Sequence, residues 1–127
     1  MEWKFSDDLP IYQQIMDGIK QRIASGDWAP GQKLPSVRDL AVEAGVNPNT
    51  MQKALAQLEQ EGLLYARRTA GRFVAEQEEI TRELQEDMVQ SYVEDFLENM
   101  RSLGYTLGDS ISFLQKMSQQ KERRVKE

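Results

Sequence analysis

Residues 34–74 have the sequence LPSVRDLAVEAGVNPNTMQKALAQLEQEGLLYARRTAGRFV. Ser36 is a favourable N-cap residue that opens a capping box, and Gly45 predicts the end of a short first helix. A second helix begins almost at once, because Asn47 and Pro48 suit the N-cap and the first helical position. Two helices joined by so short a turn predict a helix-turn-helix.

The residues on either side of this motif predict a third helix and a hairpin. Residues 10–25 form an amphipathic helix, because isoleucines recur at helical spacing: Ile11, Ile15, Ile19 and Ile23. Residues 63–66 and 72–75 have the composition of two short strands around a basic tip that contains Gly71. We therefore expect a mostly α fold with a small β-wing, a winged helix-turn-helix over residues 1–75.

After the wing, the apolar pattern becomes that of one long helix ending at Gly104. Its apolar side chains recur every four residues: Ile80, Leu84, Met88, Tyr92, Phe96 and Met100. Thr106 and Asp109 match a capping box for a last helix, whose apolar residues are Ile111, Leu114 and Met117. Residues 76–127 are thus expected to form a two-helix hairpin with a polar tail that frays from Gln119.

The residue types present exclude several classes of protein. The chain has 127 residues, 39% hydrophobic and 29% charged, a composition typical of a folded domain with little room for an elaborate active site. Cysteine and histidine are absent, so we expect neither a metal nor another cofactor. No apolar run approaches the ~20 residues of a membrane span and the start does not resemble a signal peptide, so we expect a cytoplasmic protein.

The charge is distributed unevenly along the chain. The net charge is −5, which is unusual for a protein that binds a polyanion. Residues 1–75 carry nine basic and nine acidic side chains, whereas residues 76–127 carry seven basic and twelve acidic ones. The acidic surplus therefore belongs to the second region, and residues 31–75 have a small basic excess that can form one positive face.

Four segments together resemble the DNA-binding domain of the GntR family of bacterial regulators: Leu34 to Ala41, Gly45 to Leu55, Leu58 to Leu63 and Arg67 to Val74. The resemblance covers residues 10–75 and implies a transcription regulator whose partner is double-stranded DNA. It also implies that the helix from Asn47 is a recognition helix in the major groove. The wing would then reach the adjacent minor groove or the backbone.

The residues expected to bind DNA lie at the start of the helix after Ser36, on the recognition helix and around the wing tip. They are Ser36, Arg38, Asn47, Pro48, Asn49, Thr50, Gln52, Lys53, Arg67, Arg68, Thr69, Gly71 and Arg72. The N-terminal turn of a recognition helix touches bases and phosphates. Asn and Gln can bond bidentately to adenine, and Lys suits a phosphate or a guanine acceptor. By its match to the family motif, Arg38 is expected to contact phosphate or a guanine edge.

Simpler roles stay open for these side chains. Asn47 can be a helix cap without a role in DNA binding. Arg38 can pair with a nearby acid such as Asp39 or Glu43, and the polar residues of the recognition helix and the wing arginines can be solvated surface groups. Tyr12 is expected either in the core or against a phosphate.

About 50 residues follow the wing, and two helices cannot enclose a small-molecule pocket within one protomer. This region is similar to that of the YtrA subfamily, whose short helical hairpin serves dimerisation. The subfamily resemblance implies a repressor, often of transporter operons. The expected dimer contacts are Leu84, Met88, Tyr92, Phe96, Met100, Ile111 and Leu114. Packing of this stripe on the protomer's own DNA-binding domain remains an alternative, and a small-molecule effector between the hairpins is left open.

We therefore expect a sequence-specific transcriptional regulator: a repressor that binds a palindromic operator as a homodimer, with a transporter operon as a candidate target. A rival hypothesis is a protein-interaction adaptor whose winged helix has lost DNA binding, which the overall acidity fits. Arg38, Gln52, Lys53 and the wing arginines argue against it. An enzyme is not expected, because no motif for a phosphate cradle or a nucleophile is present.

Overall fold

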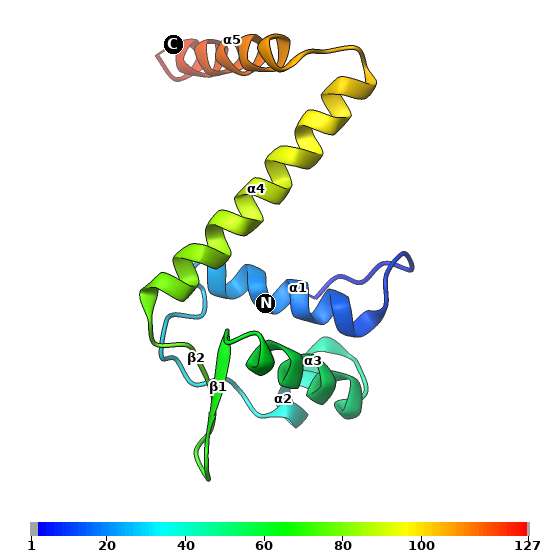
Figure 1. Cartoon of the computed structure of the whole chain (residues 1–127), viewed down its shortest axis with the longest axis vertical. Coiled ribbons are helices and arrows are strands. Elements are labelled where there is room, and N and C mark those ends of the chain that lie inside the picture. The colour runs from blue at the N-terminus through cyan, green and yellow to red at the C-terminus, as the bar shows by residue number, and fades with distance from the viewer. Residues whose placement is uncertain (1–2, 127) are drawn as a thin grey trace. The chain divides into compact units, whose positions relative to one another are not determined.

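The computed structural model describes residues 3–126; Met1, Glu2 and Glu127, which the expected domain ranges include, lie outside the described residues. Seven elements follow in order: α1 (Ile11–Ala24), α2 (Val37–Ala44), α3 (Pro48–Gln60), β1 (Leu64–Arg67), β2 (Gly71–Val74), α4 (Glu78–Ser102) and α5 (Leu107–Lys126). The expected fold class is confirmed, because helices dominate the described residues. An antiparallel hairpin of β1 and β2 extends as a wing beyond the group of helices α1, α2 and α3 (Figure 1).

The chain divides into two compact units, one up to Glu86 and the other from Asp87. The first turns of α4 therefore belong to the unit that contains the winged helix. Gln85 Nε2 donates a hydrogen bond of 3.3 Å to the carbonyl of Ala24 within this unit. The assignment of separate functions to residues 1–75 and 76–127 stays a prediction.

The core of the first unit lies where α1 and α2 pack on α3. The helical spacing of the isoleucines in α1 places three of them on one buried face, as expected from the 3.6-residue period. The largest fully buried apolar side chains of this unit are Ile15, Ile19, Ile23, Leu40, Met51, Leu55, Leu58 and Val74.

Local capping fixes where α2 and α3 begin and end. The Ser36 hydroxyl accepts a 3.1 Å hydrogen bond from the backbone N–H of Asp39, and Gly45 ends α2 with a φ of 71°. The Asn47 side chain then accepts a 2.7 Å bond from the backbone N–H of Asn49 at the start of α3. The turn between the helices is thus determined by the residues from which it was predicted.

The wing is held by a third segment in addition to its own strands. β1 and β2 pair antiparallel, with Ala66 opposite Arg72. On the other side of β2, the N–H of Leu34 donates a 2.9 Å bond to the carbonyl of Arg72, and Lys33 forms a bridge with Phe73. β2 is therefore fixed to the residues that lead into α2, which limits how far the base of the wing can move.

In the second unit, the capping box predicted for α5 is present. The N–H of Thr106 donates to the Asp109 carboxylate at 3.0 Å, and the N–H of Asp109 donates to the Thr106 hydroxyl at 3.1 Å. The helix α5 continues to Lys126, and the expectation that the tail frays from Gln119 stays a prediction. Gln, Lys, Glu and Arg are good helix formers, so a polar tail can stay helical.

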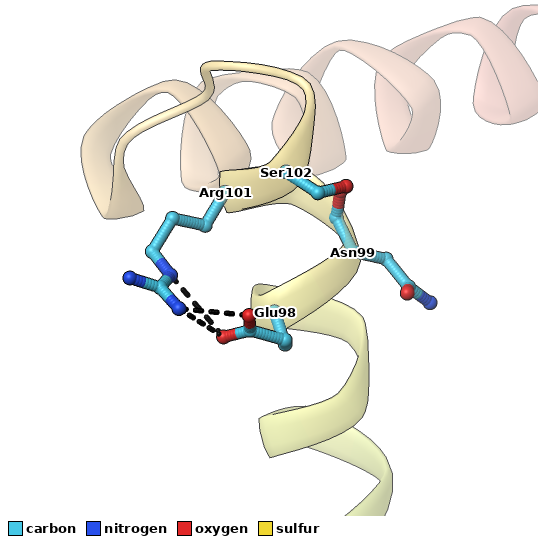
Figure 2. Close-up of polar contacts among 4 residues, drawn as sticks. All are labelled: Glu98, Asn99, Arg101 and Ser102. Carbon is cyan, nitrogen blue, oxygen red and sulfur yellow. Dashed lines mark hydrogen bonds and ion pairs between the residues drawn. The ribbon is translucent and has the colours of Figure 1, made fainter.

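An ion pair lies in the last turn of α4 (Figure 2), where Arg101 donates to the Glu98 carboxylate at 2.7 Å. The hydrogen bond and the charge of Arg101 lower the pKa of Glu98. A cation at this position also complements the negative end of the helix dipole.

Over the described residues, no helix is long and apolar enough to cross a membrane.

Candidate nucleic-acid interface

The first two turns of α3 present a polar surface. Asn49, Gln52 and Lys53 are exposed, and Thr50 is half-buried. Pro48 occupies the first turn, where the backbone N–H groups that have no partner within the helix give the end a partial positive charge. The structure thus brings together the recognition-helix residues expected from the sequence, with Asn47 as the cap beneath them.

Arg38 and Arg68 are among the exposed arginines of the first unit whose guanidinium groups have no bonded partner within residues 3–126. Arg38 lies in the first turn of α2, and Arg68 lies at the tip of the wing. Neither pairs with the local acids that the sequence offered as an alternative for Arg38. Their guanidinium groups are therefore available to an external anion.

Arg72 has two partners on α3. Its Nε donates to the Glu59 carboxylate, and its Nη1 donates to Gln52 Oε1 at 3.1 Å. The side chain of Arg72 is only 17% exposed. It is therefore engaged inside the first unit, which differs from the solvated surface position that the sequence left open as an alternative to DNA contact.

Arg67 is engaged on another part of the wing. Its Nη2 donates to the Glu76 carboxylate at 3.1 Å, and its guanidinium lies 5.1 Å from the centroid of the Phe73 ring. The same carboxylate accepts a 2.7 Å bond from the Tyr65 hydroxyl, and this bond raises the pKa of Tyr65. Among the three wing arginines, Arg68 is therefore the one whose guanidinium has no bonded partner in the described part of the chain.

The wing tip is strained at one residue. Thr69 has a φ of 71°, in the left-handed region that β-branched residues avoid. The N–H of Ala70 closes the turn by donating a 3.1 Å bond to the carbonyl of Arg67. Gly71 has a φ of 106°, and a Cβ at that position would lie 3.3 Å from Lys33 Cε. The tip thus depends on Gly71 mainly for its positive φ, because the flexible end of the Lys33 side chain can move aside.

Lys33 is a candidate DNA contact that the sequence analysis missed. It lines an open hollow of about 600 Å³ between the wing and the start of α2, together with Ser36, Thr69 and Arg72. Its position follows from the pairing of residues 33–34 with β2, which has no local signature in the sequence. A basic residue three positions before the capping Ser36 was the signal available.

The second unit presents exposed apolar residues on both helices. Every described side chain of α5 is exposed except Ser110, so the expected hairpin is not packed on itself. Of the expected dimer contacts, Tyr92, Ile111 and Leu114 are exposed, whereas Met88, Phe96 and Met100 are half-buried. Leu84 departs from the expectation, because it is 9% exposed and lies in the first unit, covered by its own chain.

No cluster of three or more acidic side chains suited to a metal ion occurs in the described part of the chain. The carboxylates described beside the candidate interface, Glu59 and Glu76, are paired with Arg72 and Arg67. This arrangement suits recognition of a polyanion and of base edges.

Comparison with known proteins agrees with this arrangement. The family described as "Bacterial regulatory proteins, gntR family" matches residues 11–74. The chain is 41% identical over 106 residues to the transcriptional regulator YhcF of Bacillus subtilis, covering 84% of this chain and 88% of that protein. It is 43% identical over 72 residues to the transcriptional repressor YtrA of the same organism, covering 57% of this chain and 55% of YtrA.

Solved structures lead to the same family. A GntR family transcriptional regulator from Listeria monocytogenes superposes with a TM-score of 0.82 at 36% identity, over 88% of this chain and 98% of that chain. The DNA-binding domain of AraR in complex with operator ORX1 superposes with a TM-score of 0.52 at 36% identity, over 59% of this chain and 92% of that one. The protein therefore belongs to the GntR family of bacterial regulatory proteins and is a transcriptional regulator.

Proposed function

We propose that this regulator is a repressor that binds a palindromic operator as a homodimer, with α3 in the major groove and the wing at the flanking backbone or minor groove. The observation that carries the proposal is the grouping of exposed α3 side chains, Asn49, Gln52 and Lys53, with the unpartnered arginines Arg38 and Arg68 in one compact unit. Donors to phosphate set affinity and register, while amides on the helix can read base edges.

The site we propose includes the residues expected from the sequence, with Lys33 added. Ser36, Asn47 and Pro48 shape the helix starts, Thr50 flanks the exposed turn of α3, and Thr69 and Gly71 shape the wing tip. Arg67 and Arg72 support the wing and α3 through their internal bonds. The AraR operator complexes support the docking of such a domain on DNA.

The homodimer is supported by the exposed apolar side chains of the second unit. Those on α4 are Val89, Tyr92 and Val93, and those on α5 are Leu107, Ile111, Phe113, Leu114 and Met117. Such a surface on two helices that are not packed on each other needs a partner to remove it from water. A second copy would give an isologous interface and two recognition helices for two half-sites.

The direction of regulation rests on relatives. YtrA and NagR of Bacillus subtilis are both named transcriptional repressors, which supports repression here. Control of a transporter operon is supported only by the subfamily resemblance. We propose no small-molecule effector for this regulator.

Selection of bound sequences from a random duplex pool by the full chain tests this function. We expect enrichment of a palindrome whose half-sites are separated by about one helical turn. The same protein with Asn49→Ala, Gln52→Ala and Lys53→Ala combined should enrich nothing, while its melting temperature stays near that of the wild type. A folded wild-type dimer that enriches no sequence at low salt would refute the proposal and favour the adaptor hypothesis.

A further inference from the structure

Arg72 connects the wing to two positions of the recognition helix. Gln52 and Glu59 are seven residues apart, so they lie on the same face of α3 two turns apart. The Arg72 guanidinium reaches both, with Nε on Glu59 Oε1 and Nη1 on Gln52 Oε1 at 3.1 Å. Glu59 is the only acid in this group, and it is half-buried.

The Arg72 side chain has little freedom to leave these partners. Its backbone carbonyl accepts the 2.9 Å bond from the N–H of Leu34, and on the other side of β2 it lies opposite Ala66 of β1. Its side chain is 17% exposed and that of Glu59 is 30% exposed. Departure of Arg72 toward a phosphate would leave a partly buried carboxylate without its cation.

This contact fixes which way the Gln52 amide points. A guanidinium has five donors and no acceptor, so the atom of Gln52 that faces it has to be the oxygen. The amide nitrogen, with both of its hydrogens, is then directed away from Arg72. Because Gln52 is exposed, these two donors are the part of the amide that remains available to an external group.

The orientation has a consequence for base recognition. Bidentate bonding of a glutamine to adenine uses the amide oxygen as acceptor and the nitrogen as donor, whereas the major-groove edge of guanine presents two acceptors, N7 and O6. We propose that Arg72 is a positioning residue that holds the Gln52 oxygen, so that Gln52 reads guanine through its two N–H donors and discriminates against adenine. This inference rests on the proposed placement of α3 in the major groove.

The test compares sequence selection by the wild type and by Arg72→Met, which keeps the length and apolar character of the side chain but removes all donors. The wild type is expected to select guanine at one position in each half-site, and Gln52→Ala should identify that position by losing the preference there. In Arg72→Met the amide is free to rotate, so adenine should be accepted at that position and the preference for guanine should fall about tenfold. The salt dependence of binding should stay unchanged.

Arg68→Met is the matched control, because it removes an unpartnered arginine from the same wing. It should weaken binding to all sequences equally and lower the logarithmic salt slope by about 0.9, without changing base preference. If Arg72→Met behaves in this way too, Arg72 is a phosphate contact and the inference is wrong. Adenine at the Gln52 position of the wild-type site would also overturn it.

Glu59→Gln provides a second variant if Arg72→Met does not fold, as judged by circular dichroism. It keeps the shape of the side chain but weakens the anchor of Arg72, so a smaller loss of guanine preference is expected at the same position. An unchanged preference in a folded Glu59→Gln protein would count against the inference. If the wild type enriches no sequence at all, the proposed function fails, whereas an enriched site without these shifts refutes only the role of Arg72.

Discussion

The ammonium group of Lys53 in the recognition helix lies 4.2 Å from the centroid of the Tyr12 ring in α1. The sequence left two positions open for Tyr12, one in the core and one against a phosphate. In the structure Tyr12 is half-buried, and its ring contacts Lys53 of α3. A cation over an aromatic face is attracted by the ring quadrupole. Tyr12 therefore restricts where Lys53 can place its charge.

A double-mutant cycle should detect this contact. We expect Tyr12→Leu and Lys53→Met to show a coupling of about 0.5–1 kcal/mol in the free energy of unfolding, measured by urea denaturation. Tyr12→Phe is the control, because it keeps the ring and should preserve the coupling. Strictly additive effects of the two substitutions would show that the contact contributes nothing.

Arg38→Ala should weaken DNA binding without unfolding the protein. Arg38 is exposed and has no bonded partner in the described part of the chain, so its removal leaves no buried group unsatisfied. We expect affinity to fall by roughly tenfold, the worth of about one charge-assisted hydrogen bond. The salt slope should drop by about 0.9.

The measurement is a salt titration of binding to the selected operator by fluorescence anisotropy. Lys116→Ala, which removes an exposed cation from α5, is the control and should change neither value. Equal affinity and equal slope for wild type and Arg38→Ala would remove Arg38 from the interface.

Leu114→Glu should convert the proposed dimer into monomers. Leu114 is 51% exposed on α5, so the substitution leaves the fold of the protomer intact but places a charge in the proposed apolar interface. We expect the dimer dissociation constant to rise about 100-fold or more, as measured by sedimentation equilibrium.

Val42→Glu is the matched control, since Val42 is 77% exposed on α2, in the other unit. It should remain dimeric. A Leu114→Glu protein that sediments as the wild-type dimer would place the interface on another surface.

Thr69→Asn should stabilise the protein. The φ of 71° at Thr69 costs a β-branched residue about 1 kcal/mol, and asparagine tolerates this region better. We expect the free energy of unfolding to rise by about 0.5 kcal/mol in urea denaturation. Ala70→Asn, one residue further along and without a positive φ, should give no such gain. A loss of stability on Thr69→Asn would mean that the threonine side chain contributes more than the strain costs.

The capping box of α5 should make stability depend on pH. The backbone N–H of Thr106 that bonds the Asp109 carboxylate lowers the pKa of Asp109. A carboxyl group whose pKa is lower in the folded state stabilises the protein at pH values above its ordinary pKa of about 3.9. This stabilisation is lost as the pH falls through the lowered pKa. Asp109→Ala should therefore reduce the urea midpoint at neutral pH but not near pH 2. A difference between the two proteins that grows on acidification would contradict this assignment.

The elements that local chemistry specifies were predicted from the sequence. The bonds at Ser36 and Asn47 depend on residues two or three positions away, and Gly45 ends α2 by its own backbone conformation. The capping box at Thr106 follows the same rule. These features need no knowledge of tertiary structure, which is why the order of helices and the wing could be inferred.

Contacts between elements far apart in the sequence could not be predicted in this way. The partners of Arg72 lie 13 and 20 residues before it and depend on how the wing meets α3. The bridge from Lys33 to Phe73 depends on the same packing. Leu84 follows the same four-residue spacing as the exposed apolar residues of α4, yet it is buried within the first unit. Periodicity alone does not say which neighbour a side chain will contact.

The pairing of Arg72 with Glu59 also bears on how quickly such a protein finds its site on a chromosome. Attraction to random DNA grows with the number of cations that replace condensed counterions. A guanidinium neutralised by its own carboxylate adds nothing to that attraction. If Arg72 has the proposed role, we expect the internal ion pair to shorten each unproductive stay on the wrong sequence, while the residue still contributes wherever the matching base is met.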